Sequence, residues 1–121
     1  MTPDAATCAL VTVGGAVVCP RVTLADTSLT RLRGLLGRRS LDPDEGLLLR
    51  PAGSVHTAFM RFPIDVVFLD RAMRVLEVRT GVAPWRIVGS RGARAVLELA
   101  AGAAARRGLE PGMALSLEGA G

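Results

Sequence analysis

The stretch from Val55 to Asp70 constrains the fold of this 121-residue chain more than any other part of the sequence. It contains the only histidine, all three phenylalanines and Pro63, and it ends in Ile64–Leu69, an apolar run interrupted only by Asp65. A short apolar run between a proline and a turn residue is typical of a buried β-strand. Because a buried strand needs neighbours on both sides, we expect a sheet to form around it.

The other apolar segments are short and are separated by glycine and proline, which predicts many strands and little helix. Gly14-Gly15 suits a hairpin turn, and Gly81–Arg94 is interpreted as a loop. Helices are expected at Ser28–Leu36 and Gly102–Arg107. The expected extended segments are Cys8–Val13, Ala16–Leu24, Gly46–Arg50, Val55–Met60, Ile64–Leu69, Arg74–Thr80, Ala95–Ala100 and Met113–Leu117.

These elements predict an α+β fold. We expect a mostly antiparallel, barrel-like curled sheet with two short helices, in a single domain covering residues 1–121. A chain of this length buries roughly two thirds of the surface that it exposes when unfolded. Half of the residues are hydrophobic, which argues against disorder.

Positive charge is concentrated in residues 21–39, which carry five arginines against a single aspartate. The net charge of the whole chain is +4, and every basic residue is arginine. One hypothesis is therefore a docking domain that uses the arginine-rich helix on an anionic partner; a solvated helix face is the simpler explanation. No aromatic residues are interleaved with this charge, and we find no nucleic-acid-binding motif.

The first residues, Met1 to Asp4, lack the basic lead and apolar core of a signal peptide. No apolar run approaches the ~20 residues needed to span a bilayer. From the sequence alone we therefore expect a cytoplasmic protein without a membrane span.

Several motifs follow one another along the chain: Arg33–Arg38, Glu45–Leu49, His56–Asp70, Pro84–Arg86, Val96–Gly102, Gly108-Leu109 and Pro111-Gly112. Together they resemble domain-of-unknown-function family 192, also called uncharacterised protein family 0127, over about residues 20–117. The resemblance implies a compact α+β domain on a barrel-like sheet and no established activity. Many members resemble envelope or secreted proteins that carry a signal or lipid-anchor segment.

The leading functional hypothesis is a binding module for a small polar or anionic ligand or for a partner peptide. The candidate ligand-binding residues are His56, Thr57, Arg61, Asp65 and Trp85. In this interpretation Arg61 fixes an anionic group, His56 makes binding depend on pH, and Trp85 supplies apolar contact.

Two other interpretations use some of the same residues. The first is a hydrolase-like enzyme in which His56 acts with Asp65. The second is structural: a polar network of Arg61, Asp65, Asp70 and Glu98 that braces the turn at Pro63. Asp65 must find a partner if it is buried, and Arg61 is the nearest candidate in the sequence, so we expect a buried Arg61–Asp65 pair.

The sequence predicts neither a metal site nor a cofactor site. One histidine and two distant cysteines do not supply the clustered ligands that zinc or iron needs. Cys8 and Cys19 flank the expected hairpin turn in diagonal positions, so both are expected to be free thiols. Asp42, Asp44 and Glu45 are interpreted as a solvated acidic turn, because the twelve-residue calcium-loop pattern is missing.

Overall fold

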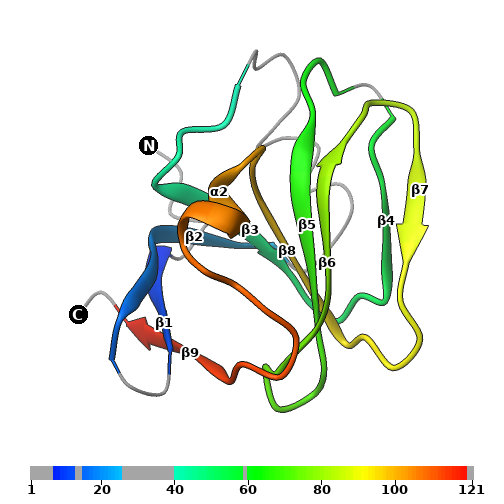
Figure 1. Ribbon diagram of the computed structural model, residues 1–121. Helices are drawn as coiled ribbons and strands as arrows, with labels where there is room; N and C mark the ends of the chain where they lie inside the picture. The colour runs from blue at the N-terminus through cyan, green and yellow to red at the C-terminus, as the bar shows by residue number, and fades with distance from the viewer. Residues whose placement is uncertain (1–6, 13–14, 26–39, 59, 120–121) are drawn as a thin grey trace.

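A computed structural model describes residues 7–12, 15–25, 40–58 and 60–119. Nine strands and one four-residue helix lie within these residues (Figure 1). The expected helix Ser28–Leu36 lies outside them. The elements are β1 Thr7–Thr12, β2 Val17–Ala25, β3 Glu45–Leu49, β4 Ser54–His56, β5 Ile64–Leu69, β6 Val75–Val82, β7 Ile87–Gly89, β8 Ala95–Ala100, α2 Ala103–Arg106 and β9 Leu115–Gly119.

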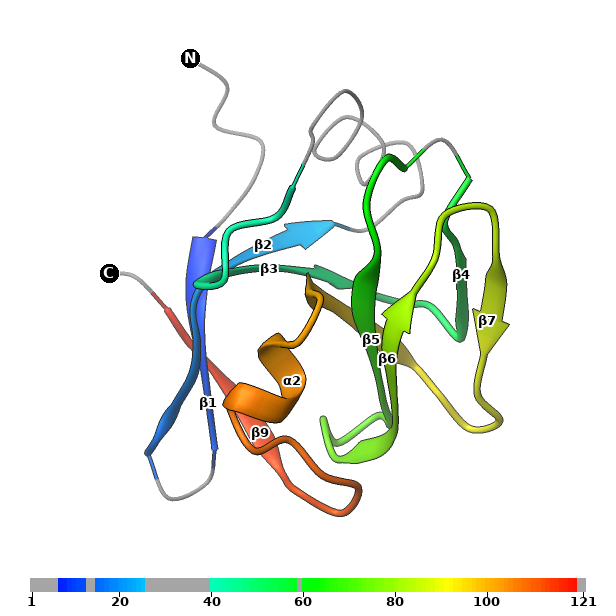
Figure 2. The same ribbon diagram turned by 45° about the horizontal axis from the view of Figure 1, so that its top comes forward.

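Seven of these strands form one mixed sheet in the order β6-β5-β8-β3-β2-β1-β9. Every neighbouring pair is antiparallel except β2 and β3, which run parallel. The predicted mostly antiparallel α+β fold is therefore confirmed. A separate ribbon of β4 and β7 stands beside the large sheet, with β7 outermost in both views (Figures 1 and 2).

The two edge strands of the large sheet approach each other at one point. Arg74 and Ala114 form an isolated bridge, and the backbone N–H of Val75 donates to the carbonyl of Met113 at 2.8 Å. This contact does not continue as a ladder between β6 and β9 in the described residues. The expected barrel-like curl is therefore not confirmed, and the sheet is not a closed barrel.

The centre of the sheet is also the centre of the core. Every residue of β5 and of β8 is buried. Both strands have the bounds that their apolar runs predict, because a strand covered on both faces has no reason to alternate. One covering element is α2, which packs against β5 and β8 (Figure 2). Its Ala103 and Ala104 are buried, since small side chains allow the helix to approach closely.

The interpretation of Gly81–Arg94 as a loop is wrong in its middle. Residues 87–89 form β7, which pairs with β4 in antiparallel register, Val55 opposite Val88. A three-residue strand on the surface has too few positions to show an alternating pattern, so the sequence gives no signal for it. This ribbon positions the candidate site.

Candidate functional site

Asp65 anchors the first end of β5. Its side chain is fully buried, with 0% of its surface exposed. Oδ1 accepts a hydrogen bond from the backbone N–H of Gly81 at 2.9 Å, and Oδ2 accepts from the backbone N–H groups of Gly102 and Ala104, each at 3.0 Å. Such bonds offset the cost of burying a carboxylate in an apolar strand. Asp65 therefore fastens the end of β6 and the start of α2 to β5.

The expected Arg61–Asp65 pair is wrong. Arg61 is exposed, whereas Asp65 lies in the core and takes its hydrogen bonds from backbone N–H groups. Backbone N–H donors cannot be identified from residue types, so the sequence suggests the nearest charged side chain, Arg61, as the partner of Asp65. Both carboxylate oxygens of Asp65 are engaged, and the structure records no hydrogen bond between His56 and Asp65.

The wider polar network does not form as one unit either. Asp70 bonds to its own turn, where Oδ1 accepts from the backbone N–H groups of Ala72 at 2.8 Å and Arg74 at 2.9 Å. Glu98 is fully buried on β8. It lies opposite Val66 of β5, on the strand adjacent to Asp65.

Thr57 fastens the ribbon to the segment that precedes β7. It is fully buried, and its Oγ1 donates to the carbonyl of Ala83 at 2.7 Å and accepts from the backbone N–H of Arg86 at 2.8 Å. Its backbone N–H donates to the carbonyl of Arg86 at 2.8 Å, and its carbonyl accepts from the N–H of Trp85 at 3.0 Å. The hydroxyl is thus a structural clamp rather than a free nucleophile.

Trp85 is held by this clamp in an unusual conformation. Its φ is 65°, in the left-handed region that non-glycine residues avoid. Its side chain is nevertheless 62% exposed, and two positions along the chain Ile87 is 82% exposed. Large apolar side chains on the surface and a strained backbone at one place are both typical of a functional surface.

His56 lies beside this surface. In the β4–β7 register it is directly opposite Ile87. Its ring nitrogen Nδ1 is buried and has no hydrogen-bond partner among the described residues. A buried polar atom without a partner costs free energy, so the position of His56 requires an explanation beyond core packing.

The outer edge of β7 presents open backbone groups. Across the ribbon, Ser90 N–H donates to the carbonyl of Gly53 at 3.2 Å, and Thr57 N–H donates to that of Arg86 at 2.8 Å. In an antiparallel ladder the intervening residues alternate in direction. The N–H and C=O groups of Ile87 and Gly89 therefore point away from β4, and β7 has no second partner strand within the described residues.

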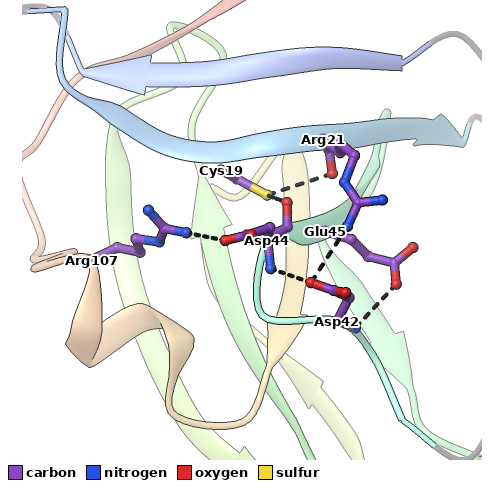
Figure 3. A network of polar contacts seen from close by, with 6 residues as sticks. All are labelled: Cys19, Arg21, Asp42, Asp44, Glu45 and Arg107. Carbon is purple, nitrogen blue, oxygen red and sulfur yellow. Dashed lines mark hydrogen bonds and ion pairs between the residues drawn. The ribbon is translucent and has the colours of Figure 1, made fainter.

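The acidic turn at Asp42–Glu45 is largely exposed, as expected, and polar contacts also tie it to neighbouring segments (Figure 3). Asp44 forms an ion pair with Arg107 at 2.6 Å, and Asp42 forms one with Arg21 at 3.4 Å. Within the turn, Asp42 Oδ1 accepts from the N–H of Asp44 at 2.8 Å, and Glu45 accepts from the N–H of Asp42 at 3.0 Å. These carboxylates link β2, β3 and the end of α2.

Cys19 is a free, buried thiol beside that turn. Its Sγ donates to the carbonyl of Asp44 at 3.5 Å (Figure 3). Burial, which removes water from the thiolate, raises the pKa of Cys19 above its ordinary value of 9.0. Among the described residues, no group of three or more His, Cys, Asp or Glu side chains could hold a metal ion. No helix in the described part of the chain is long and apolar enough to cross a membrane.

Three of the five predicted ligand-binding residues come together. The carbonyl of Thr57 accepts a hydrogen bond from the N–H of Trp85. His56 precedes Thr57 in the chain and lies opposite Ile87, two residues after Trp85. Asp65 instead organises the core, and Arg61 is exposed with no contact to Asp65. Ile87 was missed, because a lone isoleucine in an apparent loop gives no indication of its exposure.

Two solved structures share this fold. One, from Sinorhizobium meliloti 1021, is described as a proposed transcription regulator; it has a TM-score of 0.79 and 27% identity, and the match covers 97% of this chain and 96% of that one. The other, a protein of unknown function from Novosphingobium aromaticivorans, has a TM-score of 0.76 and 26% identity, with 96% and 90% covered.

Relatives of known sequence agree with this likeness. UPF0127 proteins are 35% identical in Thermococcus sibiricus, over 73% of this chain, and 37% identical in Thermococcus kodakarensis, over 55%. The matches span 60% and 45% of those relatives' own lengths. The sequence pattern of the DUF192 family, "Uncharacterized ACR", matches residues 9–117, somewhat further toward the N-terminus than the resemblance suggested. The chain belongs to the DUF192 family.

Proposed function

We propose that this domain is a binding module for an extended, acidic segment of a partner protein. The segment adds to the outer edge of β7 and rests on Trp85 and Ile87. The observation that carries the proposal is the backbone of Trp85, which is held in the left-handed region while its indole stays in solvent.

The strained backbone of Trp85 supports a role in binding because the buried Thr57 holds it in place by hydrogen bonds. Thr57 makes hydrogen bonds to Ala83, Trp85 and Arg86, and none of its surface is exposed. A left-handed backbone at a non-glycine residue costs roughly 1–2 kcal/mol. An indole fixed in the open is ready to bury apolar area on a partner with little loss of side-chain entropy.

The backbone of β7 supports an extended occupant. The outward N–H and C=O groups of Ile87 and Gly89 match the repeat of an added strand, which is how several peptide-binding domains recognise their targets. Figure 1 shows β7 as the outermost strand of its side of the molecule, where a further strand meets no other labelled element.

Charge supports an acidic occupant. Arg86 precedes β7, Arg91 follows it, and both are exposed. Carboxylates along the added strand would lie near these guanidinium groups, which favour them by charge-assisted hydrogen bonds and by faster encounter. A basic segment would meet like charges at both ends of the strand.

Trp85 is the only tryptophan in the chain, so its fluorescence reports on this surface directly. The probe is a capped peptide in which glutamate alternates with valine. Titration should shift the indole emission to shorter wavelength in a saturable way, and the affinity should fall with added salt. A capped peptide in which lysine alternates with valine should have no effect. Equal responses to both peptides would contradict the proposal.

The binding mode has its own matched test. Ile87→Pro removes one outward N–H and leaves the β4–β7 hydrogen bonds in place, because proline is tolerated on the open side of an edge strand. Ile87→Ala removes most of the side chain and keeps that N–H. We expect Ile87→Pro to weaken peptide binding at least about fivefold more than Ile87→Ala, since the ladder loses a bond. Equal losses would show that the peptide does not add as a strand.

A further inference from the structure

A second candidate binding site lies at the far end of β5, and it does not depend on the proposed function. It arises from strand order. β8 lies between β5 and β3 and runs antiparallel to both, so the last residues of β5 and β3 meet the first residues of β8. Leu69 pairs with Ala95, and Leu49 pairs with Val96.

This arrangement brings three arginines that are distant in sequence to one end of the sheet. Arg50 follows β3, Arg71 lies in the turn after β5, and Arg94 precedes β8. All three are exposed and line one open hollow of about 380 Å³. Pro51, Asp70, Met73 and Ala95 line the rest of the hollow, whose exposed wall is mainly apolar, and the arginines carry its positive charge.

The three guanidinium groups have no carboxylate partner in the part of the chain that the structure describes. Within the described residues, none of Arg50, Arg71 and Arg94 forms an ion pair. Other arginines do pair: Arg21 with Asp42 and Arg107 with Asp44. Other described arginines, such as Arg86 and Arg91, also lack an ion pair, so what distinguishes the hollow is that three such arginines line it together.

Asp70 does not neutralise the hollow. Its Oδ1 is occupied by the backbone N–H groups of Ala72 and Arg74, and no contact to the three arginines is recorded. The three arginines and Asp70 leave a net charge of +2 around one cavity. Like charges gathered in this way repel one another, and an anion bound between them removes that repulsion.

The backbone that carries the arginines is fixed in advance. The N–H of Arg94 donates to the carbonyl of Leu69 at 2.8 Å, and the carbonyl of Arg94 accepts from the N–H of Ala52 at 3.0 Å. These bonds tie the segment before β8 to the end of β5 and to the segment after Arg50. Because this backbone is already ordered, binding a ligand here would lose little backbone conformational entropy.

We propose that this hollow binds a small phosphate-bearing molecule with at least two negative charges. Planar guanidinium groups match phosphate oxygens in pairs, and three of them suit a multiply charged group better than a single carboxylate. The volume is that of a small-molecule site. Met73 offers an apolar surface to the organic part of the molecule, and Asp70 can accept a hydrogen bond from a hydroxyl group.

The test uses inorganic pyrophosphate as the probe and calorimetry as the readout, with the full chain at an ionic strength of about 0.15 M. The protein should bind pyrophosphate at one site. The double variant Arg50→Gln/Arg94→Gln should weaken binding at least about tenfold, since each change removes a charge-assisted pair of bonds. Arg106→Gln, an exposed arginine of α2 outside this hollow, should change affinity less than about twofold because surface charges at a distance are screened.

Thermal unfolding of each variant checks that the fold is kept, which is expected because all three substituted side chains are exposed. Absence of pyrophosphate binding to the intact chain would overturn the proposal. So would an equal loss in the double variant and in Arg106→Gln, which would show attraction to general surface charge. Citrate binding as tightly as pyrophosphate would overturn the assignment to phosphate.

Discussion

The two ends of β5 are each held by an aspartate, and the two aspartates work differently. Asp65 is fully buried and bonds to backbone groups 16, 37 and 39 residues away. Asp70 is half-buried and bonds only two and four residues ahead, within its own turn. The first end is therefore fixed by long-range polar contacts in the core, and the second by local turn chemistry.

The surfaces that the two ends support differ in the same way. The Asp65 end leads through Gly81 to the strained, apolar Trp85, whose placement depends on contacts across the fold. The Asp70 end supports exposed arginines, whose placement depends on which strands are neighbours. Substitutions in the supporting residues should therefore harm the first surface more than the second.

The largest difference is expected between the aspartates themselves. Asp65→Ala leaves three N–H groups without their acceptor, that of Ala104 being buried, and empties a fully buried position, so it should lower the free energy of unfolding by about 3–5 kcal/mol. Asp70→Ala exposes its turn donors to water and should cost about 1 kcal/mol. Urea unfolding of both variants measures the difference. Equal losses would end the distinction between a core anchor and a turn residue.

Thr57→Val should have the next largest effect. The change keeps the shape but removes the acceptor for Arg86 and the donor to Ala83, so about 1–2 kcal/mol of stability is lost. Thr57→Ser keeps the hydroxyl and should cost less than about 1 kcal/mol. If the clamp fixes Trp85, amide exchange at Trp85 and Arg86 should speed up in Thr57→Val and not in Thr57→Ser. Unchanged exchange in Thr57→Val would contradict the clamp.

Trp85 gives a smaller but more specific effect. Trp85→Gly and Trp85→Ala both remove the indole, but only glycine adopts a φ of 65° without a steric cost. The glycine variant should therefore be more stable than the alanine variant by about 1 kcal/mol, the reverse of the usual order. Thermal and urea unfolding both report it. A more stable alanine variant would mean that the backbone at this position is not strained.

The smallest effect is expected at Glu77 of β6, which lies opposite Phe68 of β5. Hydrogen bonds from Arg79 first and Ser90 second lower the pKa of the Glu77 carboxyl below its ordinary value of 4.5. The stabilisation is therefore present above pH 4.5 and is lost as the pH falls below it. Because both side chains are exposed, it should amount to at most about 0.5 kcal/mol. Comparing Glu77→Gln with the parent protein from neutral to acid pH tests this, and a difference that grows toward acid would have the wrong sign.

The sequence predicts the two central strands to the residue, because Ile64–Leu69 and Ala95–Ala100 are apolar runs with clear boundaries. It predicts the region of the candidate site but not the hydrogen bonds and strand pairing within it. The partners of Asp65 are backbone amides, and β7 is too short to show a period. The arginine hollow depends on the order β5-β8-β3, which no local pattern encodes. Contacts between distant segments are thus the part that the sequence alone does not define.

The meeting of the sheet's two edges at Arg74 and Ala114 has a consequence for behaviour at high concentration. Free strand edges invite pairing between copies of a protein and, from there, aggregation. In this protein the two edges of the large sheet contact each other at the Arg74–Ala114 bridge, so part of each edge is already paired. The open edge of β7 is only three residues long, and the arginines on either side of it repel the same arginines on a second copy. The arginines that we propose to attract an acidic segment would thereby also oppose pairing between copies of this chain.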